Sequence, residues 1–164
     1  MSIAVPLLVF LAALVGMEGV AWATHRWVMH GPLWALHRSH HEPQDAWFEL
    51  NDLFVLGFAA VAIGLFAWGA RPGQALATWA AAGVTTYGLL YALFHDGLVH
   101  RRWPMPAVRP NGYLARLRRA HRLHHAVRER RGAVCFGFLW PTDLGRAVRR
   151  LRLARGRALA RESR

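Results

Sequence analysis

The chain has 164 residues, of which 54% are hydrophobic, and it carries a formal net charge of +12. These values together exclude an ordinary soluble globular protein and indicate a membrane protein with basic parts outside the bilayer. The length fits one domain over residues 1–164, and the single cysteine excludes an internal disulfide.

The first predicted element is the almost uninterrupted apolar segment 3–23, which is long enough to cross a hydrocarbon core of about 30 Å. A cleaved signal peptide is the competing interpretation, but the segment lacks a basic N-terminal region. Glu18 is the one acidic residue inside it. An intramembrane carboxylate is a functional candidate, so we expect Glu18 to support the histidines that follow or to line a substrate cavity. Contact with headgroups or water is the alternative.

Two groups of histidines follow this segment. His25 and His30 are separated by four residues, and Gly31–Pro32 predicts the end of the helix. The sequence HRSHH comes next, and on a helix its three histidines share one face. An acidic stretch follows, in which we expect carboxylates to accept the far ring N–H of ligating histidines, although a solvated loop or helix cap would look similar. With Asp96 further along the chain, these candidates are Glu42, Asp45, Glu49, Asp52 and Asp96.

The segments 53–70 and 75–94 are the second and third predicted spans, joined by a tight turn at residues 71–73. The third span leads into His95 and His100, as the first leads into His25 and His30. Both pairs must lie on the same side of the membrane to form one site, and three spans satisfy this condition. We therefore expect an all-α integral membrane protein with a histidine-rich helical cap.

The basic residues give an independent test of this topology. All 21 are arginines; Arg71 lies alone in the outer turn, and the other twenty lie on the histidine side. The positive-inside rule then places the histidines in the cytoplasm and the N-terminus outside.

The C-terminal part is predicted to form the cap. Residues 113–131 have the pattern of a basic amphipathic helix that carries the second HxxHH motif. The apolar stretch 133–140 is too short to cross a bilayer, so we expect it to pack against the cap or to enter the interface. Residues 146–164 contain eight arginines and predict a helix on the membrane surface or a frayed, disordered tail attracted to anionic lipid. No nucleic-acid-binding motif is present, and we expect no nucleic acid partner.

All ten histidines fall into two copies of an HxxxxH pair followed by HxxHH. Neutral imidazole is a common ligand of iron, copper, zinc and nickel, and ten ligands are too many for one ion but fit two. Residues five apart lie about 140° apart around a regular helix, so either the helix breaks within each pair or the two histidines bind different metals. We favour a dinuclear site in which each half-motif contributes to both metals. The predicted ligands are His25, His30, His37, His40, His41, His95, His100, His121, His124 and His125.

Two other interpretations of the histidines carry less weight. A solvated face that binds metal adventitiously would not sort ten histidines into ordered pairs of motifs. A closed structural zinc site usually includes cysteine, and Cys135 lies outside the motifs.

A histidine-rich dinuclear site on membrane helices suggests iron and oxygen chemistry on a lipophilic substrate. Such a substrate would enter from the bilayer, so we expect residues one to two turns before the histidines to line its pocket. Helix-on-helix packing is the alternative role for them. The candidates, besides Glu18, are Ala21, Trp22, Tyr87, Leu90, Tyr91 and Phe94.

At this point the sequence resembles the fatty acid hydroxylase and sterol desaturase superfamily of membrane di-iron enzymes, and within it the bacterial β-carotene hydroxylases. The resemblance covers residues 18 to about 141 and is carried by HRWVMHG, HRSHHEP, FELND, YGLLYALFHDGLVHRRWP, GYLARLRRAHRLHHAVR and CFGFLW. The ten histidines match the ligand positions of the family. Plant relatives have a further N-terminal helix, so the number of membrane spans stays open between three and four.

The resemblance implies a non-haem di-iron monooxygenase in the bacterial inner membrane that hydroxylates carbon 3 of β-ionone rings, converting β-carotene through β-cryptoxanthin to zeaxanthin. It further implies two iron ions, O2 as co-substrate, and electrons from a ferredoxin and an NAD(P)H-linked reductase. Zinc could replace iron in purified samples. A carotenoid ketolase or lipid desaturase on the same scaffold is the alternative. A non-catalytic metal transporter or sensor is the third class, but a transporter would place ligands near the bilayer midplane.

Overall fold

The computed structural model describes residues 2–42, 46–140 and 143–162, with side chains as far as residue 156. All regular elements in these ranges are helices, which confirms the all-α expectation. In chain order they are α1 (Ala4–Ala23), η1 (Thr24–Met29), α2 (Trp34–His41), α3 (Asp52–Gly69), α4 (Ala75–Tyr91), η2 (Ala92–Val99), α5 (Tyr113–His124) and α6 (Leu144–Glu162).

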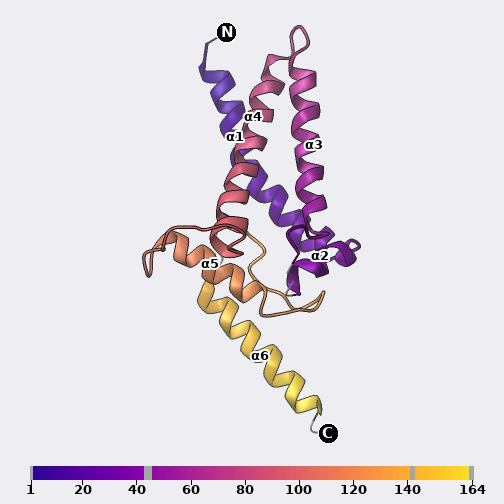
Figure 1. The fold of residues 1–164 in the computed structure, drawn as a ribbon, viewed down its shortest axis with the longest axis vertical. Coiled ribbons are helices and arrows are strands. Elements are labelled where there is room, and N and C mark those ends of the chain that lie inside the picture. The colour runs from indigo at the N-terminus through magenta and orange to yellow at the C-terminus, as the bar shows by residue number, and fades with distance from the viewer. Residues whose placement is uncertain (1, 43–45, 141–142, 163–164) are drawn as a thin grey trace.

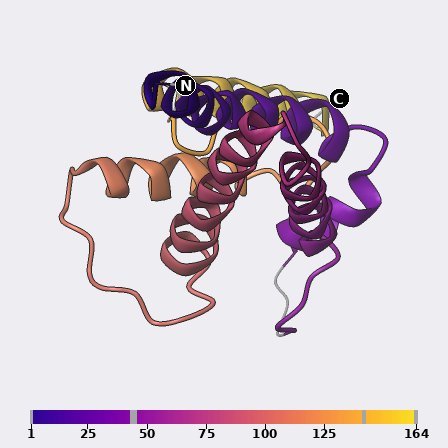
Figure 2. The ribbon, with the colours of Figure 1, turned by 90° about the horizontal axis from the view of Figure 1, so that it is seen from above.

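Three helical stretches in the described ranges are long and apolar enough to cross a membrane, namely Ala4–Met29, Asp52–Gly69 and Ala75–Val99. Their length and apolar composition indicate a membrane protein, and these three candidates overlap the three spans that the sequence predicts. Few residues along these spans are buried within the isolated chain, as expected for surfaces that face lipid. Helix α4 packs against both α1 and α3 (Figures 1 and 2). Gly83 allows the close approach of α1, because a Cβ there would lie 2.5 Å from the carbonyl oxygen of Phe10.

The first and third spans are longer than predicted because each continues as a π-helix. In η1 the N–H of His30 donates to the carbonyl of His25 at 3.0 Å, and in η2 that of His100 donates to His95 at 2.9 Å. These i→i+5 bonds define the wider π-helical turn. The helices end where expected, with Gly31–Pro32 just after η1 and a turn at residues 70–73 between α3 and α4.

The second HxxHH motif lies on α5, but this helix ends at His124 and does not reach residue 131 as predicted. The chain turns after His125, so that the carbonyls of Val127 and Arg130 can face histidines of the first half. The apolar segment after this turn packs onto the cap, as one of the two predicted alternatives had it. Its buried residues Val134 and Cys135 form a small core with Ala120 of α5 and Ala147 of α6.

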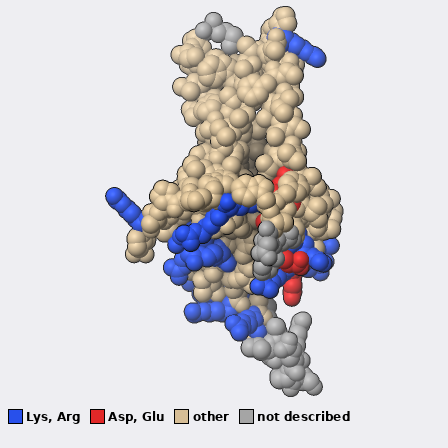
Figure 3. Space-filling view, in the orientation of Figure 1, with Lys and Arg blue, Asp and Glu red and all other residues tan. Residues whose placement is uncertain are grey.

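Residues 144–162 form the helix α6, which agrees with the helical one of the two alternatives predicted for residues 146–164. The first turns of α6 are held by Ala147 in the small core, with Leu144 and Leu151 packed around it. The helix extends from the cap away from the spans (Figure 1). Basic side chains gather over the cap end of the molecule and are sparse along the spans (Figure 3), in line with the arginine asymmetry of the sequence.

Candidate metal centre

The ten histidines meet where the first and third spans enter the cap, and nine of them form two groups. Cluster A contains His25, His30, His37, His41 and His124. Cluster B contains His40, His95, His100 and His121. Within each cluster the ring nitrogens lie within 4.8 Å of one another. His125 lies beside cluster B, with its Nε2 2.7 Å from that of His121.

The assignment of histidines to clusters follows the sequence repeat. Each HxxxxH pair stays within one cluster, whereas each HxxHH motif is divided. In each HxxHH motif, the first and third histidines face the cluster that contains the HxxxxH pair of the same half of the sequence. The middle histidine lies in the other cluster. His40 therefore joins the second-half cluster B, and His124 joins the first-half cluster A. The expectation that every half-motif serves both metals thus describes the HxxHH motifs but is wrong for the HxxxxH pairs.

The π-helices explain why the HxxxxH pairs do not split. Histidines five apart diverge on an α-helix, but in η1 and η2 they are joined by i→i+5 hydrogen bonds and lie one wide turn apart. The ring centroids of His25 and His30 are 5.4 Å apart, and those of His95 and His100 are 4.6 Å apart. The helix changes its pitch rather than breaking, which was not among the expected solutions.

Most of the histidines are oriented by an acceptor on the ring nitrogen that faces away from the cluster. In seven of them Nδ1 contacts an oxygen at 2.7–3.0 Å. A carbonyl or carboxylate oxygen can only accept, so Nδ1 carries the proton and Nε2 presents a lone pair. The pairs are His25 with Phe136 O, His30 with Arg130 O, His37 with Asn51 Oδ1, His40 with Glu49 Oε2, His41 with Val127 O, His95 with Asp96 Oδ1, and His124 with Val134 O.

This arrangement fits metal ions. Within the clusters the Nε2 atoms approach to 2.9–3.2 Å, as between His25 and His37 or between His40 and His95. Lone pairs at that distance repel one another unless a cation lies between them. Two nitrogen ligands about 2.1 Å from a metal, at right angles to each other, are separated by about 3 Å. The donor set and its spacing therefore match a metal site.

Burial keeps the imidazoles of the cap in the form that binds metal. Loss of solvation lowers the pKa of His41 and of His100 to about 4, and that of His37 to about 2. It also holds the pKa of His40 and His124 well below the ordinary value of 6.5. These rings are therefore neutral near pH 7, as ligation requires.

Two of the predicted carboxylates contact histidines directly. Glu49 and Asp96 accept the Nδ1–H of His40 and His95 in cluster B, and Arg102 joins the two carboxylates at 3.4 and 3.7 Å. Burial raises the pKa of Glu49, and this effect exceeds the opposing attraction of Arg102.

The other predicted acids lie elsewhere. Asp52 binds Arg102 at 2.9 Å and accepts the backbone N–H of Glu49, so it supports the carboxylates rather than a histidine. Glu42 forms an exposed ion pair with Arg38 one helical turn away. Asp45 lies outside the described residues. Glu18 accepts hydrogen bonds from the segment 138–140 and does not line the cavity described below.

Several residues that orient histidines were not predicted. Asn51 stood within the acidic stretch, where only carboxylates were considered as partners. Arg102 could have been suspected from the clustering of acids in an arginine-rich chain. The four backbone carbonyls on residues 127–136 have no sequence signal, because any residue type supplies a carbonyl.

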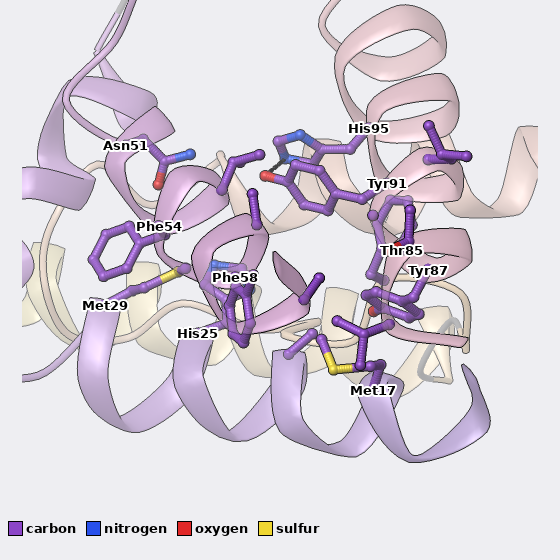
Figure 4. Close-up of a pocket in the computed structure, with 18 of the residues that line it drawn as sticks. Met17, His25, Met29, Asn51, Phe54, Phe58, Thr85, Tyr87, Tyr91 and His95 are labelled. Carbon is purple, nitrogen blue, oxygen red and sulfur yellow. Dashed lines mark hydrogen bonds between the residues drawn. The ribbon is translucent and has the colours of Figure 1, made fainter. Parts of the chain in front are cut away.

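An apolar cavity of about 430 Å³ leads from the spans to both clusters (Figure 4). His25 and His37 of cluster A and His40, His95 and His121 of cluster B lie at its end. Of the predicted pocket residues, Ala21, Tyr87 and Tyr91 line it. Figure 4 shows Met17, Tyr87 and Tyr91 around the cavity and Phe54 and Phe58 along another side.

The prediction was wrong for Trp22, Leu90 and Phe94, which do not line the cavity. The reason is helical phase: Met17, Ala21 and His25 repeat every four residues from α1 into η1, and Trp22 points off this face toward Trp27. The wall contributed by α3 was not predicted, because α3 does not lead into a histidine pair. It consists of Phe54, Val55, Phe58, Ala59, Ala62, Ile63 and Phe66.

A second, polar cavity of about 530 Å³ reaches the clusters from another direction. His40, His41, His100 and His125 face it. Its other lining residues are Glu42, Ala46, Trp47, Glu49, Arg102 and Arg128. The candidate metal centre therefore adjoins one apolar and one polar cavity.

Comparison with known proteins is consistent with this architecture. Residues 10–143 match the family model of the fatty acid hydroxylases. A β-carotene hydroxylase of Pseudescherichia vulneris is 52% identical over 87% of this chain and 82% of its own length. A β-carotene hydroxylase of Pantoea ananas is 46% identical over 91% and 85%. The chloroplastic β-carotene 3-hydroxylase 1 of Arabidopsis thaliana is 41% identical over 80% of this chain and 43% of its own length. No solved structure matches significantly.

Proposed function

The chain belongs to the fatty acid hydroxylase family of hydroxylating oxidoreductases, and we propose that it hydroxylates carbon 3 of the β-ionone rings of β-carotene. The products are β-cryptoxanthin and then zeaxanthin. One observation carries the proposal: an apolar cavity among membrane spans ends at histidines of both clusters. That is the arrangement required to bring a C–H bond of a bilayer-dissolved molecule to an oxidising metal centre.

The chain would hold two iron ions, one in each histidine cluster. Bound iron supplies activation of O2, with one oxygen atom entering the C–H bond and the other leaving as water after uptake of two electrons and two protons. The chain's own residues bind the substrate and exclude water. Phenylalanines of α3 and tyrosines of α4 surround an apolar ring and keep water from the reacting carbon.

The substrate enters from the lipid, because β-carotene is too apolar to cross water. Electrons come from a ferredoxin and an NAD(P)H-linked reductase on the polar side. The polar cavity supports this division, since it is separate from the apolar one and also reaches histidines of both clusters. We infer that this side faces the cytoplasm of a bacterial inner membrane, next to anionic lipid headgroups; the basic side chains of the cap support this orientation through the positive-inside rule.

Expression in cells that already make β-carotene, followed by pigment chromatography, tests the proposal. Zeaxanthin is the expected product. Ketocarotenoids would instead indicate a ketolase on the same scaffold, and the absence of any new pigment would leave a non-catalytic metal protein.

The cavity can be tested in the same cells with a matched pair of variants. Gly88 lines the cavity and Gly16 does not, and a Cβ at either would meet no atom within 4 Å. Gly88→Trp should therefore block hydroxylation with unchanged metal content, whereas Gly16→Trp should not. Normal zeaxanthin from Gly88→Trp would exclude this route of entry.

A reporter fused at the Arg71 turn tests the orientation. It should report a position outside the cytoplasm, and a reporter after Arg164 should report the inside. The reverse pattern would place the histidines on the outer side.

A further inference from the structure

Glu18 makes an unusual set of contacts for an acid inside a membrane span. Its carboxylate accepts the backbone N–H groups of Phe138, Leu139 and Trp140 at 2.8, 2.9 and 3.0 Å. It also accepts the hydroxyl of Tyr87 at 2.8 Å. An ionised carboxylate has about four lone-pair sites, so four donors match its capacity. Irregular backbone next to lipid requires such partners, because unpaired amides are costly there.

Glu18 holds residues 138–140, and these belong to the segment 133–140, which also orients histidines of cluster A. Its carbonyl at Phe136 accepts the Nδ1–H of His25 at 3.0 Å, and that at Val134 accepts the Nδ1–H of His124 at 2.8 Å. The Phe136 ring lies 5.2–5.4 Å from the rings of His25, His30 and His124. Position and orientation of these imidazoles therefore depend on where the segment lies.

The same segment forms part of the cavity. Phe136, Gly137 and Phe138 line it, and the ring of Phe138 lies 5.2 Å from that of Tyr91. Tyr87, the fourth donor to Glu18, lines it as well. A displacement of the segment would therefore change the metal centre and the cavity wall together.

We propose that Glu18 is a positioning residue for cluster A. By fixing residues 138–140 to α1, it sets the carbonyls that orient His25 and His124 and places Phe138 against the cavity. The inference rests on the proposed function only in assuming that the clusters hold metal. Cluster B should be less sensitive to Glu18, because Glu49 and Asp96 orient two of its four histidines and neither carboxylate lies on this segment.

Gly137 offers a second way to disturb the same contact without changing the carboxylate. A Cβ at this position would lie 2.8 Å from the carbonyl oxygen of Trp140 and 3.3 Å from Oε1 of Glu18. Gly137→Ala should therefore push the segment away from Glu18. If both residues act through one contact, the double variant should be no worse than either single variant.

The experiment uses the full-length protein in detergent, titrated with Co²⁺ alone and followed by absorption, with hydrogen exchange measured on residues 133–140. Glu18→Gln keeps the shape of the side chain but places an amide donor against amide donors. We expect faster exchange at residues 138–140 and a fall from two bound Co²⁺ ions per chain toward one. Gly137→Ala should do the same. Tyr87→Phe, which removes one donor only, should have a smaller effect, and the exposed control Glu129→Gln should have none.

Faster exchange in Glu18→Gln with both cobalt ions retained would overturn the proposal. Equal loss of cobalt from both clusters would also overturn it, as would a double variant whose effect is the sum of the effects of the two single variants. If Glu18→Gln does not yield folded protein, Tyr87→Phe and Gly137→Ala decide by the same criteria. Neither readout requires turnover. A wild-type protein that binds cobalt but makes no zeaxanthin in cells would count against the proposed function alone.

Discussion

Clusters A and B are similar in their histidines but differ in what holds them. The described Nδ1 partners in cluster A are neutral: four backbone carbonyls and the side-chain oxygen of Asn51. Those in cluster B are the carboxylates of Glu49 and Asp96. A carboxylate partner makes an imidazole a stronger donor than a carbonyl does. An ion in cluster B would therefore have the more electron-rich ligands, even though Arg102 offsets part of the negative charge.

The two clusters also differ in how they can be damaged. Cluster B depends on side chains brought together by Arg102 from the start of α3, the loop before it and η2, and one substitution can remove any of them. Cluster A depends largely on the backbone of residues 127–136, which substitution cannot delete and can only displace. A substitution near cluster B should therefore disturb that cluster locally. In cluster A, the effect of a substitution should be transmitted through the backbone of residues 127–136.

The largest expected effect comes from removing a ligand. His124→Ala should empty cluster A and His40→Ala should empty cluster B, because each is the histidine that crosses from the other half of the repeat. Product should fall by more than about 100-fold in both, since even residues that merely orient ligands cost up to about that factor.

The readouts are zeaxanthin yield in cells and metal analysis of the purified protein. Both variants should still insert in the membrane, because the spans are unchanged. Full activity in either variant would break the dinuclear assignment. Zinc in such samples would count as site occupancy but not as the active metal, because zinc binds nitrogen ligands more tightly than ferrous iron.

The carboxylates of cluster B should give the next largest effect. Asp96→Asn and Glu49→Gln keep the size of the side chain and the possibility of an accepted hydrogen bond but remove the charge. We expect about 10- to 100-fold weaker metal binding in cluster B, measured by competitive titration with a chelator, and little change in A. Equal weakening of both clusters would show that charge acts on the centre as a whole.

The sequence predicts the gathering of the histidines and the three candidate spans, because both depend on residue types at fixed spacing. Four histidine motifs, three apolar segments and one arginine-poor turn are visible without any structure. It does not predict how histidines five apart converge, because residue spacing gives no sign that a π-helical turn replaces the regular α-helix there. The division of each HxxHH motif between clusters likewise depends on packing between distant helices.

The contacts that orient cluster A could not be predicted for a different reason. His25 and Phe136 are 111 positions apart, and a backbone carbonyl carries no information about residue type. Glu18 was recognised as unusual, but its partners are backbone amides 120 or more positions away. The cavity residues were half predicted, because helical phase decides between Ala21 and Trp22 and the wall from α3 depends on tertiary packing.

Acidification should affect both clusters in the same pH range and so should not distinguish them. Burial lowers the pKa of His41 in cluster A and of His100 in cluster B to about 4, from an ordinary value of 6.5. Below pH 6.5 the unfolded chain therefore binds protons that the folded metal-free protein does not bind. Stability should be level above about pH 7 and fall as the pH drops from 6.5 toward 4, by up to about 1.4 kcal/mol per pH unit for a buried histidine.

The measurement is the thermal unfolding midpoint of the metal-free protein in detergent across this range. Stability that rises on acidification would contradict the burial of neutral imidazoles. Loss of metal from one cluster a full pH unit above the other would contradict the similar titration of the two clusters.

The smallest expected effect comes from giving cluster A the kind of partner that cluster B has. Asn51 is buried, and its Oδ1 accepts the Nδ1–H of His37 at 2.7 Å. Asn51→Asp keeps this acceptor and adds a negative charge, which should make His37 a stronger ligand. The gain in affinity of cluster A should be less than about tenfold, because burying a carboxylate near Glu49 and Asp52 offsets part of the benefit. In competitive metal titrations, Asn51→Asp should raise the metal affinity of cluster A, whereas Asp96→Asn should lower the metal affinity of cluster B. Weaker binding in A would mean that the neutral partners are required there, and that the contrast between the clusters is not a matter of charge alone.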